Sequence, residues 1–541
     1  MTSRLVRPGK YRLDWPLGAF AALIVVALYW PSLKFDLFND DYLLLRPWPP
    51  EHLVGVLTGS WFVLDAHDYY RPVAIYLYNA MFWAFGLNTR ALHVLPLVTM
   101  TVVAWLAGRV VRRETGSMAL GAVAAGLHAI HPITAVAIGP WIANQYQGVV
   151  SAMLLISLLW WQRCRDRPWP YWLPLVIPIT IGAFTKETGL MIPLMIGAIH
   201  MVRARMFGDV RPAGRAIVLG GLALFVGLNL WRLSAVDAVH PPVDSVWGMA
   251  QRFVQGPLDA LFEPRNMTTR WWKYVFAASS AVLVVVAGHA LVTRKHRAAA
   301  ATALAGLVIL LAASVPTSLV YSTDRLAPHG TGAVLLLTAG VAALWPRIRG
   351  RWRLAGGLAA AVAVAVSVGI SRDAMRRFEP CNSAWLQEPE TLFDEPRQPP
   401  PEMVRWVRTA RETCGVSTPP PLFRATSRIT WGVAEQQVTP GVFVHHWIQP
   451  RVVALLDQHG TSVIVELRHP GATADRPVIV TLSANGADPT NVALTSGAWT
   501  AAQLVLTPGL RTWLRQMHRL EMHVAPSAVP GLAMRPLDVV Y

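Results

Sequence analysis

The chain has 541 residues, of which 53% are hydrophobic and only 15% are charged, and its formal net charge is +17. This composition is too apolar for an ordinary soluble enzyme of that size. The arginines gather in short clusters between apolar runs, which is the positive-inside pattern of a membrane protein and unlike a nucleic-acid-binding patch, so no nucleic-acid partner is predicted.

Apolar runs with roughly the length of a membrane span, about 20 residues each, recur through the first two thirds of the chain. We expect eleven spans, at 17–34, 91–109, 117–134, 143–162, 171–185, 188–204, 214–233, 274–293, 300–318, 329–346 and 353–370. No cleavage motif follows the first run, so it is predicted to be a retained helix. Segment 73–88 is apolar and aromatic but short, and we expect it to lie at the membrane interface.

The arginine clusters set the predicted orientation. They fall in alternate loops, on the same side as the basic N-terminal segment, and this side is predicted to be cytoplasmic. Eleven spans then place the C-terminal part of the chain outside. We therefore expect a multi-pass protein of a bacterial inner (plasma) membrane with a periplasmic C-terminal domain.

The composition changes after the last apolar run. Residues 373–440 are rich in Pro, Glu and Gln and are predicted to form a linker with a short helix. From residue 441 onward, short alternating runs are separated by Gly and Pro turns, which is typical of a β-sandwich. The predicted strands are 442–447, 462–467, 478–483, 491–494, 503–506, 519–524 and 538–541. The predicted division is a transmembrane domain at 1–372, a linker at 373–440 and a β-rich domain at 441–541, and whether this tail binds carbohydrate is left open.

The chain has three cysteines, and none has metal-type spacing. Cys381 and Cys414 both fall in the predicted periplasmic tail, which is an oxidising compartment, whereas Cys164 falls on the cytoplasmic side. We predict a Cys381–Cys414 disulfide and a free Cys164.

An acidic pair, Asp40-Asp41, follows the first span in the predicted outer loop. A carboxylate at this position can act as general base on a hydroxyl acceptor, and its adjacent neighbour influences its pKa. The alternative is that the pair caps a short surface helix, because Asp is a preferred N-cap residue.

Two further charged motifs lie at outer span ends. Lys186-Glu187 sits at the tight turn between the fifth and sixth spans, where charges at membrane depth are costly and should be paired or functional. The alternative is a mutual salt bridge. Arg325 precedes the tenth span and is a candidate phosphate clamp, because guanidinium binds phosphate oxygens bidentately; the alternative is a pair with Asp324 or a lipid headgroup.

His128 and His131-Pro132 end the third span. Two histidines at this spacing are compatible with metal binding, but no acidic residue lies nearby in sequence, and three protein ligands are usual. We favour His131 as a hydrogen-bonding lining residue at a helix broken by Pro132. No cofactor is predicted, and a divalent cation is left open.

The ordered series of motifs resembles the GT-C superfamily of membrane glycosyltransferases. Its members here are the acidic pair, Tyr70-Arg71-Pro72, Phe85-Gly86-Leu87, His93, Leu127-His128-Ala129-Ile130-His131-Pro132 and Lys186-Glu187-Thr188-Gly189. The series covers about residues 15–345 and is most similar to protein O-mannosyltransferases and the transmembrane-and-tetratricopeptide-repeat O-mannosyltransferases. The chain departs from the pattern at Thr134-Ala135 and Asn144-Gln145, and the β-rich tail stands where the repeats would be.

The resemblance implies a polytopic α-helical fold and transfer of a sugar, with inversion, from a polyprenyl-phosphate carrier to a protein, lipid or glycan acceptor on the outer face. It implies Asp40 as general base with Asp41 beside it. Arg71, His131, Lys186, Glu187 and Arg325 are the expected substrate-binding residues, with the outer cations stabilising the departing lipid phosphate. The alternatives are a transporter or flippase for lipid-linked saccharide and an inactive glycan-binding membrane protein.

Overall fold

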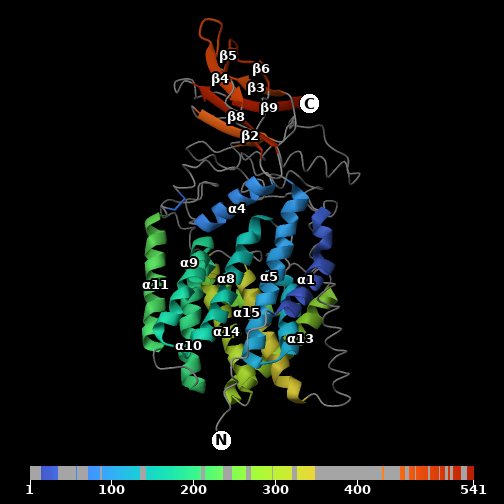
Figure 1. Ribbon diagram of the computed structural model, residues 1–541, viewed down its shortest axis with the longest axis vertical. Coiled ribbons are helices and arrows are strands. Elements are labelled where there is room, and N and C mark those ends of the chain that lie inside the picture. The colour runs from blue at the N-terminus through green and yellow to red at the C-terminus, as the bar shows by residue number, and fades with distance from the viewer. Residues whose placement is uncertain are drawn as a thin grey trace.

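The computed structural model describes most of the helical region and the C-terminal strands. The described residues are 14–34, 56–57, 71–85, 88–134, 142–208, 214–235, 246–262, 270–294, 296–319, 326–347, 429–431, 451–456, 462–469, 471–484, 488–498, 500–505, 510–511, 516–524 and 533–540. Figure 1 shows an upright helix bundle with a layer of strands beyond one of its ends.

The helices follow one another closely along the chain. They are α1 (Trp15–Tyr29), η1 (Trp30–Lys34), α4 (Pro72–Phe85), α5 (Thr89–Thr115), α6 (Met118–Ile130), η2 (Ile142–Asn144), α8 (Gln145–Cys164), η3 (Trp169–Leu175), α9 (Val176–Thr185), η4 (Glu187–Met191), α10 (Ile192–Phe207), α11 (Gly214–Ala235), α12 (Val246–Leu261), α13 (Arg270–Thr293), α14 (Arg297–Leu319), α15 (Ala327–Leu344) and η6 (Trp345–Arg347).

Local sequence explains where these helices start and stop. The side chain of Asn88 accepts a hydrogen bond from the Ala91 amide and caps α5, and Ser117 caps α6 in the same way through Leu120. Between the two helices Gly116 adopts φ 72°, a left-handed conformation that glycine takes without steric cost, so α5 ends and the chain reverses.

Six described helical segments are long and apolar enough to cross a membrane. They are Trp15–Leu33, Arg90–Thr115, Glu187–Phe207, Tyr274–Thr293, Arg297–Ser318 and Ala327–Leu344. Each of the first ten predicted spans overlaps one of the described helices, and 353–370 lies outside the described residues. The chain is therefore a polytopic helical membrane protein, and the count of eleven spans stays a prediction.

One end of the bundle collects arginines, and we call it the arginine end. Asp14, at the start of α1, pairs with Arg109 and Arg112 near the end of α5. Arg294, which follows α13, and Arg297, which opens α14, donate to the carbonyls of Met206 and Phe207 at the end of α10. The basic loops that the sequence places on one side of the membrane therefore meet at one end of the bundle.

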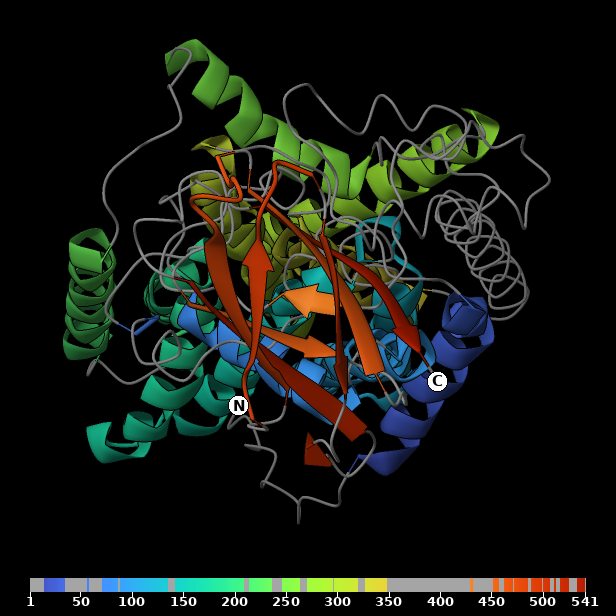
Figure 2. The ribbon, with the colours of Figure 1, turned by 90° about the horizontal axis from the view of Figure 1, so that it is seen from above.

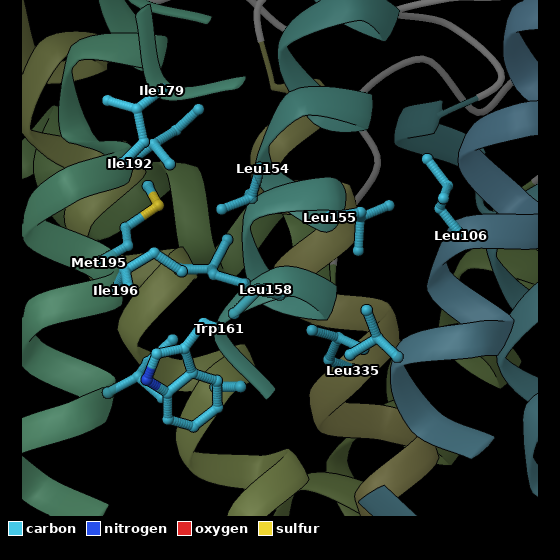
Figure 3. Close-up of a cluster of buried hydrophobic side chains, with 14 of the residues drawn as sticks. Leu106, Leu154, Leu155, Leu158, Trp161, Ile179, Ile192, Met195, Ile196 and Leu335 are labelled. Carbon is cyan, nitrogen blue, oxygen red and sulfur yellow. The ribbon is translucent and has the colours of Figure 1, made fainter. Parts of the chain in front are cut away.

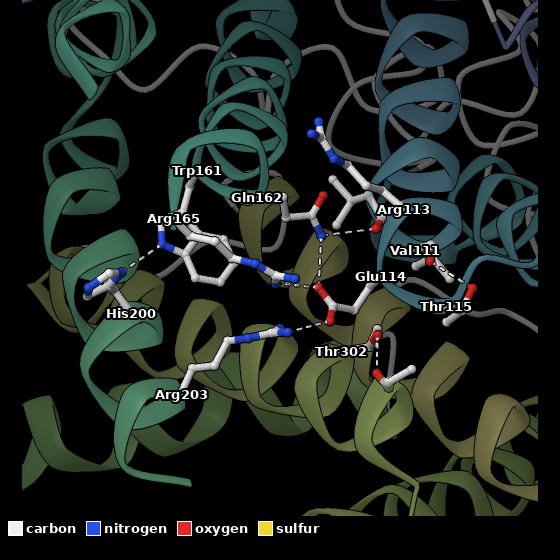
Figure 4. Close-up of polar contacts among 12 residues, drawn as sticks. Val111, Arg113, Glu114, Thr115, Trp161, Gln162, Arg165, His200, Arg203 and Thr302 are labelled. Atoms are coloured by element: carbon white, nitrogen blue, oxygen red, sulfur yellow. Dashed lines mark hydrogen bonds and ion pairs between the residues drawn. The ribbon is translucent and has the colours of Figure 1, made fainter. Parts of the chain in front are cut away.

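A carboxylate at this end joins three helices (Figure 4). Glu114, near the end of α5, pairs with Arg203 of α10 at 2.7 Å and with Arg165, which follows α8, at 3.3 Å. Gln162 adds a hydrogen bond to the same carboxylate and another to the carbonyl of Val110. Because Arg203 is only 3% exposed, this network is a buried link between α5, α8 and α10.

The largest apolar cluster fills the middle of the bundle (Figure 3). Leu154, Leu158 and Trp161 of α8 lie between Ile192 and Met195 of α10 on one side and α5 and α15 on the other. Glycines allow the closest crossings: at Gly306 of α14 a Cβ would lie 2.6 Å from the carbonyl oxygen of Gly332 in α15. Small residues at such contacts are typical of helix packing in membranes.

The C-terminal strands form two antiparallel sheets. The strands are β1 (Ile429–Trp431), β2 (Arg451–Leu456), β3 (Ser462–Arg468), β4 (Val478–Ala484), β5 (Thr490–Leu494), β6 (Thr500–Val505), β7 (Leu510–Arg511), β8 (Gln516–Val524) and β9 (Ala533–Val540). One sheet has the order β1-β2-β8-β4-β5 with β7 beside β8, and the other has the order β6-β3-β9. Buried and exposed residues alternate along β4 and β6, which is the pattern of sheets with one face covered.

Predicted strands at 462–467, 478–483, 491–494, 503–506, 519–524 and 538–541 overlap β3, β4, β5, β6, β8 and β9, and the predicted strand at 442–447 lies outside the described residues. The sequence analysis missed β2 and β7, and it placed the region of β1 in the linker, although β1 pairs with β2. The division of the chain into three parts and the sandwich architecture stay predictions. Viewed along the bundle, the strands lie over the helices (Figure 2).

Candidate functional site

The end of the bundle opposite the arginine end, which we call the outer end, holds the polar motifs. The helices α5 and α8 run toward the arginine end, so their first residues lie at the outer end. α4 crosses this end beneath the strand layer (Figure 1). α6 returns from the arginine end, which brings His131 to the outer end.

Arg71 and Glu187 form a bidentate ion pair at the outer end. Arg71 Nη2 lies 2.8 Å from Glu187 Oε2, and Arg71 Nε lies 2.9 Å from Glu187 Oε1. Arg71 directly precedes α4 and is 6% exposed, whereas Glu187 opens η4. The carboxylate of Glu187 thus pairs with a residue 116 positions away in the sequence, and the two hydrogen bonds fix the plane of the guanidinium of Arg71.

The ring of Tyr146, near the start of α8, lies against two cations. The guanidinium carbon of Arg71 is 5.2 Å from the ring centroid and the ammonium nitrogen of Lys186 is 5.1 Å from it. Tyr78 of α4 meets the same ring edge-on at 6.5 Å. The aromatic ring stabilises the positive charge of both side chains, so Arg71 and Lys186 gather around one ring.

A glycine makes the turn that presents Lys186 and Glu187. A Cβ on Gly189 would overlap the carbonyl of Gly182, so only glycine lets α9 and η4 approach this closely. In the motif Lys186-Glu187-Thr188-Gly189, the last residue must therefore be glycine because of the close backbone contact. The first two residues carry the charges.

Histidines of α6 and α15 lie beneath the outer end. His128 Nε2 is 3.1 Å from Thr331 Oγ1, and His329 Nε2 is 3.1 Å from Ser314 Oγ of α14. His131 meets Phe276 of α13 edge-on at 5.8 Å. Across the described ranges, no three His, Cys, Asp or Glu side chains are arranged so as to hold a metal ion.

The structure brings several predicted site residues to one end. Arg71, Lys186 and Glu187 share one set of contacts, and His131 lies at the same end on α6. Asp40, Asp41 and Arg325 lie outside the described residues, as do Cys381 and Cys414, so their roles stay predictions. Cys164 is buried and free, which confirms that expectation.

Sequence reasoning gave no role to Tyr146 or His329, and it did not predict helix α12. Tyr146 lies at the start of a span, and aromatic residues are common there whether or not a ligand binds. His329 is a single histidine in an apolar run. α12 falls in a segment read as an outer loop, and its exposed positions Val246, Ala250, Val254 and Leu258 recur every four residues, which is the signal that identifies it.

A scan of protein-family models and a search of curated proteins gave no match. Solved structures do resemble the chain. The structure of ArnT from Cupriavidus metallidurans bound to undecaprenyl phosphate is 13% identical and covers 82% of this chain and 94% of its own, with a TM-score of 0.45. The archaeal oligosaccharyltransferase AglB from Archaeoglobus fulgidus, in complex with an inhibitory peptide and a dolichol-phosphate, is 14% identical and covers 75% of this chain and 60% of its own, with a TM-score of 0.43.

The arabinosyltransferase EmbB from Mycobacterium smegmatis is 12% identical and covers 99% of this chain and 66% of its own, with a TM-score of 0.36. Of these three neighbours, AglB is named as an oligosaccharyltransferase and EmbB as an arabinosyltransferase. At such identities and scores, no substrate or residue role is transferred from them to this chain.

Proposed function

We propose that the chain is a GT-C-type membrane glycosyltransferase. It takes a sugar from a polyprenyl-phosphate carrier and transfers it, with inversion, to an acceptor at the outer end, which is the periplasmic face of a bacterial inner membrane. Asp40 acts as general base on the acceptor hydroxyl, with Asp41 beside it.

The observation that carries this proposal is the pair of cations around Tyr146. Arg71 and Lys186 are 6% and 3% exposed in a bundle of apolar helices, where charges are costly and mark functional sites. Glu187 pairs with Arg71 at 2.8 Å, and Lys186 lies against the same aromatic ring as Arg71, so two cations gather at one place. A phosphate group is the ligand that such an arrangement favours.

The chemistry gives these cations a role. When the bond between the sugar and its phosphate breaks, the leaving phosphate gains negative charge, and preorganised cations stabilise that charge. An inverting transfer needs its base on the face of the sugar opposite the leaving group. Lys186 lies at a different outer turn from Asp40, between the fifth and sixth predicted spans, which allows base and phosphate clamp to approach from different sides.

A transfer assay tests the proposal. Purified protein is supplied with a radiolabelled polyprenyl-phosphate sugar and membrane extract as acceptor. Wild type should transfer label, and Arg71→Ala should lower turnover by about 10²–10³-fold, the usual cost of removing one preorganised donor. Arg205→Ala, which changes an exposed arginine of α10, is the matched control and should keep wild-type turnover.

Thermal melting of each variant distinguishes lost chemistry from lost folding, because Arg71 also holds Glu187. Wild-type turnover in a folded Arg71→Ala variant would remove the phosphate clamp from the proposal. No transfer by wild type from a panel of hexose and pentose carriers would contradict the enzymatic function itself.

A further inference from the structure

Several buried polar side chains of the outer end have atoms without a hydrogen-bond partner among the residues that the structure describes, and three of these side chains lie beside Gly330 in space or in the chain. Their atoms without a partner are both ring nitrogens of His131, Oγ1 of Thr134 and Nδ1 of His329. The three residues are 2%, 0% and 0% exposed. Burying such a group unpaired is unfavourable, so a cluster of them indicates a bound polar ligand or water.

The first two of these side chains lie against α15 at Gly330. A Cβ on Gly330 would lie 3.0 Å from Thr134 Oγ1 and 3.7 Å from His131 Nδ1, so this glycine keeps the space beside both groups open. His329 is the neighbour of Gly330 in the chain. Its Nε2 is engaged by Ser314, which leaves Nδ1 as the atom available to a ligand.

Helix α12 covers this cluster with its smallest residues. At Gly256 a Cβ would lie 2.8 Å from His329 Nε2. The backbone of Ala260, one helical turn further on, lies beside His131, although no hydrogen bond of normal geometry joins them. Residues four apart share one face of a helix, so Gly256 and Ala260 form a single small surface over both histidines.

The cluster borders the cation pair but differs from it in chemistry. Lys186 directly precedes η4, which packs on α14, and His329 contacts Ser314 of that same helix. Lys186 also shares the ring of Tyr146 with Arg71. Imidazole nitrogens and a threonine hydroxyl can donate and accept hydrogen bonds, which is what sugar hydroxyls require. The two neighbouring sets of groups therefore offer a ligand different chemistry, cations in one and hydrogen-bonding groups in the other.

We propose that His131, Thr134 and His329 form a subsite that hydrogen-bonds the hydroxyl groups of an uncharged sugar, beside the cations that hold its phosphate. This inference rests on the proposed function and adds the class of sugar. An amino sugar would bring an ammonium group toward Lys186, so like-charge repulsion selects against it.

Binding measurements with three probes test the subsite on the full chain in lipid nanodiscs. The probes are sugar-free decaprenyl phosphate, decaprenyl phosphate carrying glucose, mannose or galactose, and decaprenyl phosphate carrying glucosamine. Wild type should bind at least one neutral-hexose carrier about tenfold or more tightly than the glucosamine carrier. Thr134→Val keeps the shape and removes the hydroxyl, so it should weaken binding of that hexose carrier about 3- to 10-fold. Its affinity for the sugar-free carrier should stay within about twofold.

Matched variants control for packing. The hydroxyl of Thr338, on α15, bonds the carbonyl of Val334 in its own helix, so Thr338→Val should leave the affinity for every probe unchanged. Gly330→Ala fills the space beside Thr134 and should weaken binding of the hexose carrier alone. In Gly227→Ala the added Cβ has nothing within 4 Å, so this variant should bind every probe like wild type.

Each adverse outcome points to a different part of the account. If Thr134→Val and Gly330→Ala leave the binding of every probe unchanged, or weaken the binding of all probes equally, the cluster holds water only. The inference is then overturned, and the proposed function stands. Equal affinity for hexose and glucosamine carriers overturns the selection for an uncharged sugar. If wild type binds none of the probes, both the inference and the proposed function are contradicted.

Discussion

Tyr146 presents one aromatic ring to two cations, with Arg71 at 5.2 Å and Lys186 at 5.1 Å from its centroid. Each such cation–ring interaction stabilises a desolvated cation by up to about 2 kcal/mol. Tyr146→Leu should therefore lower affinity for a sugar-free polyprenyl phosphate by roughly 3- to 30-fold for each cation that no longer faces a ring. Tyr146→Phe keeps the ring and is the matched control, so it should bind like wild type.

Binding of the labelled carrier to purified variants measures this effect. Equal weakening in both variants would assign the role to the phenol hydroxyl instead of the ring, and unchanged affinity in both would remove Tyr146 from the site.

The sequence identified the charged residues of the site but not their arrangement. Arg71, Lys186 and Glu187 stand out because charges within apolar runs are rare. Which of them pair could not be predicted, since Arg71 and Glu187 are 116 residues apart and meet only through the packing of α4 on α9. Tyr146 and His329 gave no comparable signal, because aromatic residues and single histidines in spans are common.

The helices α5, α8 and α10 are joined at the arginine end by Glu114. Its carboxylate is 8% exposed and accepts from Arg203 at 2.7 Å and Arg165 at 3.3 Å. Glu114→Gln keeps the size of the side chain but removes its charge from beside a buried guanidinium, which should destabilise the protein by about 3–5 kcal/mol. Melting of the detergent-solubilised protein checks this.

Asp166→Asn changes an exposed carboxylate at the same end and should alter stability by less than about 0.5 kcal/mol. A melting temperature for Glu114→Gln that matches this control would show that the network contributes nothing net.

The crossing of α14 and α15 depends on glycine. A Cβ on Gly306 would lie 2.6 Å from the carbonyl oxygen of Gly332 and 2.7 Å from the amide nitrogen of Leu336, both backbone atoms that cannot turn aside. Gly306→Ala should therefore push the helices apart and cost roughly 1–3 kcal/mol. On α13, Gly288 has nothing within 4 Å of its Cβ position, so Gly288→Ala should be neutral or slightly stabilising. An equally stable Gly306→Ala would contradict the crossing.

Over the whole molecule, apolar runs and arginine clusters were sufficient to predict the helices and which of their ends lie together. The sequence did not predict α12, because its apolar residues form a stripe along one face and no continuous run. It therefore resembles neither a membrane span nor a polar loop. The pair of strands β1 and β2 was not predicted, because the two lie on either side of residue 441. The start of the β-rich domain was placed there from composition alone.

The orientation of the chain can be measured with reporter fusions. Arg297 lies at the arginine end, and three predicted spans, 300–318, 329–346 and 353–370, separate it from Arg372. A reporter after Arg297 should be active on the cytoplasmic side, and one after Arg372 on the periplasmic side. Reporters on the same side would contradict the predicted number of spans.

The central claim is glycosyl transfer at the outer end with Asp40 as base. Its most direct test is turnover of a labelled polyprenyl-phosphate sugar by folded wild type, Asp40→Asn and the Asp40→Asn/Asp41→Asn double variant. Loss of general-base catalysis should lower turnover of Asp40→Asn by about 10²–10⁴-fold, and the double variant should be at least as impaired. Wild-type turnover in the double variant would contradict the mechanism.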